Sequence, residues 1–184
     1  MKYYKQVQLK NGIECIIRNA TYEDGPEVSE LFVLTHGETD YLLSYPEEHS
    51  FDPKGESEFL KKREESNNEV MLIAVVDNKI VANAGISALG TKFKVRHRAE
   101  FGINVAKDYW GLGIGKVLMN ACIECAKAAG YKQLELDVVA DNEKAINMYK
   151  GVGFIEFGRN PLGFISKYSG VQELIYMRLE LKQF

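Results

Sequence analysis

The sequence predicts an α/β fold in which helices flank a mixed β-sheet of about seven strands. Residues 99–105, 114–128 and 131–140 have the patterns of a strand, an amphipathic helix and a second strand, and such a crossover joins two parallel strands of one sheet. Two apolar runs, residues 70–76 and 80–87, are separated by three polar residues, which is typical of an antiparallel hairpin. A sheet that holds both kinds of pair is mixed.

The other predicted elements follow from hydrophobic periodicity. Before the hairpin, the pattern predicts a strand at residues 12–18 and helices at residues 23–36 and 56–65. After the crossover, it predicts a short helix at residues 143–150 and strands at residues 154–159 and 172–181, joined by a loop at residues 160–170. Basic side chains alternate with others in residues 92–98, which indicates a half-solvated strand or hairpin edge. We expect one domain over residues 1–184, because 46% of the residues are apolar and can form one core.

The composition argues against several classes of protein. The net charge of −3 lacks the basic excess that binds a nucleic-acid backbone, so no nucleic-acid partner is expected. No apolar run approaches the roughly 20 residues of a membrane span, and the N-terminus lacks a secretion signal, so we expect a cytoplasmic protein without a membrane partner. A homodimer is possible on the sequence alone. The three cysteines are expected to be free thiols, and Cys122 and Cys125 to pack in the core and bind no metal.

The stretch from Ala99 to Lys116, AEFGINVAKDYWGLGIGK, leads from a strand into three glycines that open a helix. The first amides of a helix have no intrahelical partners and carry the positive end of the helix dipole, so they attract anions. Glycines let a bulky pyrophosphate approach the backbone closely. The stretch therefore predicts a phosphate-binding loop, with a plain tight turn between strand and helix as the alternative.

Two nucleotide-binding motifs do not fit the spacing of these glycines. A Walker loop, Gly-x4-Gly-Lys-Ser/Thr, would need a glycine at Trp110 and a hydroxyl group at Val117. A Rossmann fingerprint would need a third glycine, but counting from Gly111 or Gly113 places a lysine or a leucine there. Binding of NAD or another nucleotide is therefore disfavoured.

The same stretch resembles the pyrophosphate loop of the GCN5-related N-acetyltransferase (GNAT) family, which reads Gln/Arg-x-x-Gly-x-Gly/Ala after a strand with an apolar end. Gly113 and Gly115 match the glycines of this pattern, and Val105 matches the strand end. Trp110 stands at the Gln/Arg position, which leaves the backbone cradle intact but replaces the side chain that the family uses there.

A second motif lies one strand further along the chain. Asn142-x-x-Ala145-x-x-x-Tyr149-x-x-x-Gly153-Phe154 is similar to the C-terminal signature of the same family. Asn142 and Tyr149 are seven residues apart and so lie almost in line on one face of a helix. An N-cap asparagine and a core tyrosine are the plain alternative. Two linked motifs are far more specific for the family than either motif alone.

The resemblance implies that the sheet splits between residues 99–105 and 133–140 and that acetyl-CoA, the acetyl donor, binds in the split. It assigns the pyrophosphate to the backbone of Gly111, Leu112, Gly113, Ile114, Gly115 and Lys116, and the pantetheine to Ile103, Asn104, Val105 and Asn142. Tyr149 beside the sulfur is then the acid that protonates the departing thiolate. The implied reaction is direct attack on the thioester by an amine, which is a small amine, an amino acid or a peptide N-terminus.

The base that deprotonates the amine is our own assignment. We expect it to be Glu100, on the strand that faces the split, with His97 in reserve, although many family members work through a water molecule. A non-catalytic sensor that binds acyl-CoA is the alternative function, and it would need neither Tyr149 nor a base.

The long loop at residues 37–55 is expected to border the acceptor side of the split. Its acidic and aromatic residues suggest the hypothesis that carboxylates and ring faces hold a cationic amine. The carboxylates are Glu38, Asp40, Glu47, Glu48 and Asp52, and the rings are Tyr41, Tyr45 and Phe51. An ordinary solvated acidic loop is the alternative.

Overall fold

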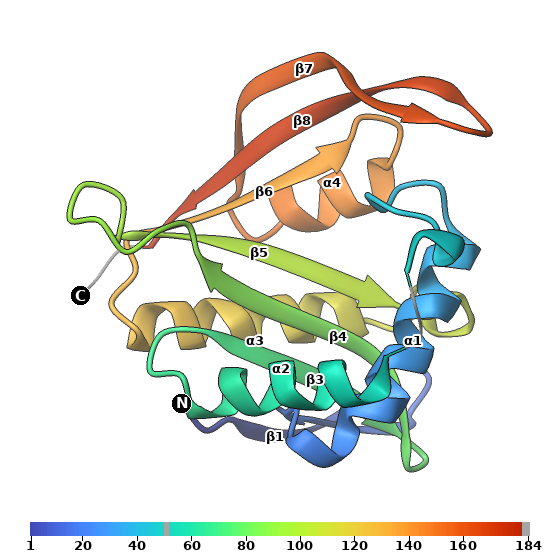
Figure 1. Cartoon of the computed structure of the whole chain (residues 1–184), viewed down its shortest axis with the longest axis vertical. Coiled ribbons are helices and arrows are strands. Elements are labelled where there is room, and N and C mark those ends of the chain that lie inside the picture. Colours follow the sequence, from blue (N-terminus) through green and yellow to red (C-terminus); the bar gives the residue numbers. More distant parts are fainter. Residues whose placement is uncertain (50–51, 182–184) are drawn as a thin grey trace.

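The computed structural model describes residues 1–49 and 52–181, and this part of the chain contains one mixed eight-stranded sheet (Figure 1). The strands are β1 (Tyr4–Gln8), β2 (Glu14–Asn19), β3 (Val70–Val76), β4 (Lys79–Ala88), β5 (Arg98–Val105), β6 (Gln133–Val139), β7 (Ile155–Ser166) and β8 (Gly170–Glu180). The α-helices are α1 (Gly25–Glu38), α2 (Pro53–Glu65), α3 (Ile114–Ala128) and α4 (Glu143–Lys150). The strand order is β1-β2-β3-β4-β5-β6-β8-β7, in which β5 and β6 are parallel and the other described neighbours antiparallel. The predicted α/β class with a mixed sheet flanked by helices is confirmed.

The two edge strands differ from the prediction. β1 was not predicted, because it is an exposed edge strand and its short sequence has no buried, alternating apolar positions. β7 was predicted to end at residue 159 but continues to Ser166, so the first part of the expected loop at residues 160–170 belongs to this strand, with an irregular register between Asn160 and Phe164. Pro161 lies in this edge strand, where a missing backbone N–H group breaks no interior ladder of the sheet.

Of the two interpretations of residues 92–98, the strand is wrong and the hairpin fits better, because residues 92–97 belong to the connection between the antiparallel strands β4 and β5. The backbone amides of Val95 and Arg96 both donate to the carbonyl oxygen of Lys92, at 2.9 Å, and β5 starts only at Arg98. These local hydrogen bonds close turns that project basic side chains into solvent. An alternating pattern of exposed residues therefore imitated a strand.

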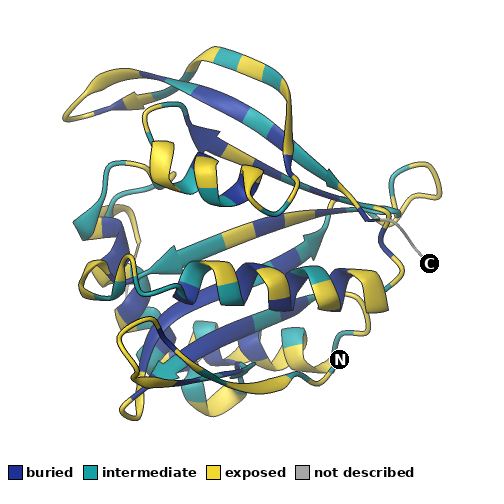
Figure 2. Ribbon diagram, turned by 180° about the vertical axis from the view of Figure 1, so that it is seen from behind, coloured by how far each residue is buried: buried dark blue, intermediate teal, exposed yellow. Residues whose placement is uncertain are grey.

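The helices divide between the two faces of the sheet (Figures 1 and 2). α1 and α2 cover one face, where Val28 and Leu60 share an apolar cluster with Ile73 of β3. α3 covers the opposite face and points its apolar stripe at the sheet, as Figure 2 shows by the buried positions along this helix. Cys122 and Cys125 lie in that stripe as buried free thiols, which confirms their predicted packing in the core.

The sheet splits between β5 and β6. These strands are paired at three positions, Arg98 with Gln133, Ala99 with Leu134 and Glu100 with Glu135. Beyond that point β5 continues along β4 and β6 along β8, and Figure 1 shows the two strands diverging toward their C-terminal ends. The predicted split between residues 99–105 and 133–140 is therefore confirmed, and it exposes the backbone edges of two strands to one opening.

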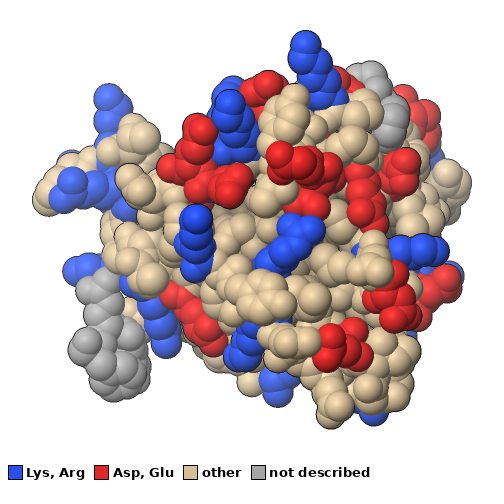
Figure 3. Space-filling view, turned by 90° about the horizontal axis from the view of Figure 1, so that it is seen from below, with Lys and Arg blue, Asp and Glu red and all other residues tan. Residues whose placement is uncertain are grey.

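Two surface properties accompany this fold. Among the described helices none is long and apolar enough to cross a membrane. On the face that Figure 3 shows, acidic and basic side chains lie interspersed. This mixture agrees with a net charge of only −3.

Candidate active site

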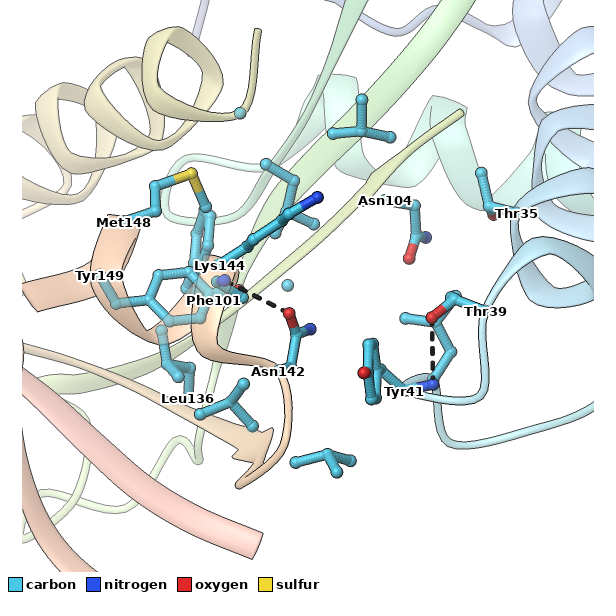
Figure 4. Close-up of a pocket in the computed structure, with 18 of the residues that line it drawn as sticks. Thr35, Thr39, Tyr41, Phe101, Asn104, Leu136, Asn142, Lys144, Met148 and Tyr149 are labelled. Carbon is cyan, nitrogen blue, oxygen red and sulfur yellow. Dashed lines mark hydrogen bonds between the residues drawn. The ribbon is translucent and has the colours of Figure 1, made fainter. Parts of the chain in front are cut away.

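A cleft of about 1270 Å³ occupies the split in the sheet. Its walls come from β5, β6, the first turns of α3 and α4, and the segment that follows α1. Figure 4 shows Thr39 and Tyr41 of that segment across the cleft from Asn142 and Tyr149. The cleft therefore brings together segments that are more than 100 residues apart in the sequence.

The glycine stretch forms one end of the cleft. Gly113 is the N-cap of α3 with a left-handed φ of 96°, and no side chain caps the first amides of this helix. A Cβ atom at Gly115 would lie 3.0 Å from the Sδ atom of Met148, so glycine lets the start of α3 approach α4 closely. Of the predicted pyrophosphate residues, Gly111, Gly113, Ile114, Gly115 and Lys116 line the cleft. Leu112 does not line it, and its carbonyl oxygen accepts a hydrogen bond from the amide of Lys10.

Trp110 fastens the glycine loop to the end of β5. Its indole N–H group donates a hydrogen bond of 2.7 Å to the carbonyl oxygen of Val105. The ammonium group of Lys144, in the first turn of α4, lies 6.0 Å from the centre of its ring. The side chain of Trp110 therefore has a structural role, and its indole N–H group is already hydrogen-bonded to the carbonyl oxygen of Val105.

Three lysines gather around the glycine loop. Lys10, Lys116 and Lys144 are the basic residues that line the described cleft. Lys10 lies in the turn between β1 and β2, and its side chain passes 3.8 Å from the position of a Cβ atom at Gly113. Sequence analysis missed Lys10, because nothing in its local pattern indicates that the β1–β2 turn packs against a loop 100 residues further on.

Asn142 and Tyr149 lie on α4 as the second motif predicts. The Oδ1 atom of Asn142 accepts a hydrogen bond from the amide of Ala145 at 3.3 Å, so Asn142 caps this helix, and it also lines the cleft. Tyr149 is 7% exposed, and its ring packs against Phe101 and Phe154 with ring centres 6.3 Å and 5.9 Å away. The two side chains thus combine the structural role of the plain alternative with a place in the cleft wall.

The hydroxyl group of Tyr149 opens into the cleft. The side chain as a whole is buried, and no described residue forms a hydrogen bond with the hydroxyl, but its oxygen is not among the buried atoms that lack a partner. Burial raises the pKa of this phenol well above its usual value, and the negative charge of Asp137 raises it further. The phenol therefore stays protonated at neutral pH and has a proton to donate.

Glu100 and Asp137 lie on the same face of the sheet, on the two sides of the split. Glu100 is paired with Glu135 in the last parallel pair, and Asp137 follows two residues later along β6. Both line the cleft. Burial raises the pKa of Glu100, and the negative charges of Asp137 and Glu135 raise it further. Arg98 forms an ion pair with Glu135 and lowers the pKa of that carboxyl group.

Asp137 was missed by sequence analysis, because only part of the signal is local. Alternation along residues 133–139 places Asp137 on the face opposite to Leu136 and Val138, but only the pairing of Glu100 with Glu135 brings that face next to Glu100. His97, the reserve base, precedes β5 and does not line the cleft. In the described residues, no group of three or more potential metal ligands gathers anywhere.

The acidic loop borders the cleft, but its carboxylates point elsewhere. Asp40 accepts hydrogen bonds from Ser166 at 2.6 Å, Ser169 at 2.7 Å and Gln172, all in the β7–β8 hairpin. The other carboxylates also have partners: Glu38 with the amide of Lys107, Glu47 with the ammonium group of Lys167, Glu48 with the amide of Tyr45, and Asp52 with the amide of Gly55. The loop residues that do line the cleft are Thr39, Tyr41, Leu42 and Leu43. None of the five loop carboxylates lines the cleft, which contradicts their part of the hypothesis, whereas Tyr41, one of its rings, does line it. Phe51 lies outside the described residues.

Comparisons with known proteins place the chain in a family. The model of the acetyltransferase (GNAT) family matches residues 34–154, well over half of the chain. The chain therefore belongs to the GNAT acetyltransferase family. Its structure is similar to that of a GNAT acetyltransferase from Streptococcus pneumoniae, with a TM-score of 0.86 and 27% identity, covering 90% of this chain and 99% of the other. It is also similar to yncA from Salmonella typhimurium, solved with its cofactor acetyl-CoA, with a TM-score of 0.81 and 18% identity over 92% and 95% of the two chains.

The curated relatives are similar over shorter stretches. The L-amino acid N-acetyltransferase AaaT of Escherichia coli (strain K12) is 33% identical over 84 residues, which are 45% of this chain and 51% of AaaT. Across the curated relatives that it matches, the chain spans between 24% and 51% of their length.

Proposed function

We propose that this chain is an acetyl-CoA-dependent N-acetyltransferase that moves an acetyl group to an amine by direct attack. The observation that carries the proposal is the split between β5 and β6. It ends at the uncapped start of α3 and places Tyr149 on one side and Glu100 on the other. Membership of the GNAT family supports the same reaction class.

The cleft has the features that bound acetyl-CoA requires. The amides at the start of α3 and the ammonium groups of Lys10, Lys116 and Lys144 provide positive charge for phosphates at one end. The split edge of β5 offers backbone groups to the pantetheine amides before Val105, whose carbonyl oxygen is occupied by Trp110. The volume of about 1270 Å³ exceeds the roughly 300–1000 Å³ of common small-molecule sites, which suits a long donor together with an acceptor.

Two residues of the cleft, Glu100 and Tyr149, take part in the proton transfers of this reaction. The cosubstrate supplies an activated acetyl group as a thioester. The acceptor ammonium loses a proton to Glu100, directly or through water, and its nitrogen bonds to the acetyl carbon as the carbon–sulfur bond breaks. Tyr149 gives its proton to the departing thiolate. The bonded nitrogen then loses its second proton through water, which restores the phenol of Tyr149, and Glu100 releases its proton to solvent. The products are the acetylated amine and a free thiol.

Binding and chemistry can be tested separately. The chain has one tryptophan, Trp110, and it lines the cleft beside the glycine loop, so its fluorescence should report acetyl-CoA binding. Acetyl-CoA at 100 times its dissociation constant should stabilise the fold by about 2.7 kcal/mol, whereas NAD and ATP should not shift the melting temperature. Thiol release across a panel of amines then measures turnover.

Three outcomes of this experiment are distinct. Thiol release that depends on an amine supports the proposal. Binding of acetyl-CoA without thiol release for any amine would support the acyl-CoA sensor instead. A melting shift with NAD and none with acetyl-CoA would contradict the assignment of the cleft itself.

A further inference from the structure

The acceptor side of the cleft carries two carboxylates without ion-pair partners. Glu100 and Asp137 line it, and neither forms a salt bridge or a hydrogen bond with a described residue. Glu135, next to them on the same face, differs because Arg98 holds it in a bidentate ion pair, with one of the two distances at 2.7 Å. On this face of the sheet, the carboxylates that have no described ion pair are therefore Glu100 and Asp137, while Asp141 and Glu143, before and at the start of α4, also line the cleft without one.

The position of Asp137 relates it to both candidate catalytic groups. Its charge raises the pKa of Glu100 and also that of Tyr149, so it lies within electrostatic range of the candidate base and the candidate acid. The hydroxyl group of Tyr149 opens into the same cleft, where a ligand can reach it. Tyr149 is more than nine-tenths buried, lines the same cleft and has no described hydrogen-bond partner.

The positive charges of the cleft lie at its other end. Lys10, Lys116 and Lys144 surround the glycine loop, close to Gly113 and Trp110. On the face of β4 and β5 that carries Glu100, the other polar residues of the cleft are neutral: Asn83, Ser87 and Asn104. The segment after α1 adds Thr39 and Tyr41, and Figure 4 shows both across the cleft from Asn142. In the described lining, no cation is available on this side for a carboxylate of the acceptor.

We propose that the acceptor is an amine with a second positive charge and no carboxylate, and that Asp137 binds this second charge while Glu100 receives the proton of the attacking nitrogen. The inference rests on the proposed acetyltransferase function and names its substrate class. The reacting ammonium becomes neutral when it gives its proton to Glu100, so only a second positive charge on the acceptor can pair with the exposed carboxylate of Asp137. A diamine supplies that second charge. A free amino acid would instead place its carboxylate near two others, so this chain should differ in specificity from the L-amino acid N-acetyltransferase AaaT that it partly resembles.

The experiment compares acceptors that differ by one charged group. Cadaverine has a second ammonium group, pentylamine lacks it, and lysine adds a carboxylate to the carbon skeleton of cadaverine. Thiol release from acetyl-CoA is measured with each acceptor, and we expect kcat/KM for cadaverine to exceed the other two values at least tenfold. A second pair, agmatine and arginine, repeats the comparison with a guanidinium group. Asp137→Asn should reduce the preference for cadaverine over pentylamine to about one, mainly through a higher KM for cadaverine.

Asp141→Asn is the matched control. It removes the same charge from another carboxylate of the cleft lining, located in the turn before α4, and it should retain the preference for cadaverine. If lysine is as good an acceptor as cadaverine, or if Asp141→Asn abolishes the preference as strongly as Asp137→Asn, the inference is wrong while the acetyltransferase function stands. If acetyl-CoA binds and no amine releases thiol, the proposed function fails and the inference fails with it.

Discussion

Replacing Tyr149 with phenylalanine separates binding from chemistry with the smallest possible change. The ring keeps its contacts with Phe101 and Phe154, and the lost hydroxyl group has no hydrogen-bond partner in the described chain. The free energy of unfolding should therefore change by no more than about 0.5 kcal/mol. For a chain of this length, that is a melting shift of about 1–2 °C.

The effect on turnover should be much larger than the effect on stability. A general acid contributes about 10²–10⁴ to the rate, which corresponds to about 2.7–5.5 kcal/mol of transition-state stabilisation. We therefore expect kcat for thiol release to fall at least tenfold in Tyr149→Phe, while the acetyl-CoA affinity, measured by Trp110 fluorescence, stays within a few-fold. Binding and turnover are thus expected to respond independently.

Tyr131→Phe is the control for this substitution. The hydroxyl group of Tyr131 is buried outside the cleft and accepts a hydrogen bond of 3.0 Å from Asn68. Its loss should cost about 1 kcal/mol, or about 2–4 °C in melting temperature, and leave kcat unchanged. The reasoning would be refuted if Tyr149→Phe kept wild-type turnover, because the thiolate would then take its proton from another source.

The remaining predictions concern charge in and around the cleft. Glu100→Gln should flatten the acidic limb of the rate–pH curve. It should also melt slightly higher than wild type at neutral pH, since the raised pKa of Glu100 means that its charged form destabilises the fold there; the gain is small because the side chain is exposed and solvent screens its charge. This gain should disappear below the ordinary pKa of 4.5, where both folded and unfolded chains hold the proton. Asp137→Asn should move the acidic limb to lower pH. Asp137 and Glu135 carry the two negative charges that raise the pKa of Glu100, and the substitution removes the first of them. Lys10→Ala should weaken acetyl-CoA binding up to about fivefold, which corresponds to the loss of one exposed ion pair. The substitution should also reduce the salt dependence of acetyl-CoA binding, measured by Trp110 fluorescence. Asp40→Asn should speed amide hydrogen exchange in residues 39–45, because the hydrogen bonds of Asp40 to the β7–β8 hairpin position this segment. It should also raise the KM of the acceptor several-fold with less change in kcat. Unchanged exchange would contradict this positioning role of Asp40.

Local sequence patterns determined most of the architecture and both motifs of the cleft. The apolar stripe of α3, the crossover from β5 to β6 and the cap at Asn142 all depend on residues a few positions apart, and the structure has each of them. The alignment of Asn142 with Tyr149 is equally local, because one helix carries both. Such features depend on periodicity and turn chemistry, which a single segment contains in full.

The tertiary structure alone decided the features that join distant segments. An exposed edge strand such as β1 has no buried alternation to reveal it, whereas the alternating side chains of residues 92–97 imitated a strand although their backbone forms turns. The carboxylate of Asp40 looked available for a substrate, but its partners in the β7–β8 hairpin lie more than 120 residues further along the chain. Asp137 comes beside Glu100 only because the last pair of β5 and β6 sets the register at the start of the split. Pairing of strands and partners of charges depend on the folded arrangement of the whole chain, so no local pattern could predict which carboxylates are used by the fold and which are left to face the cleft.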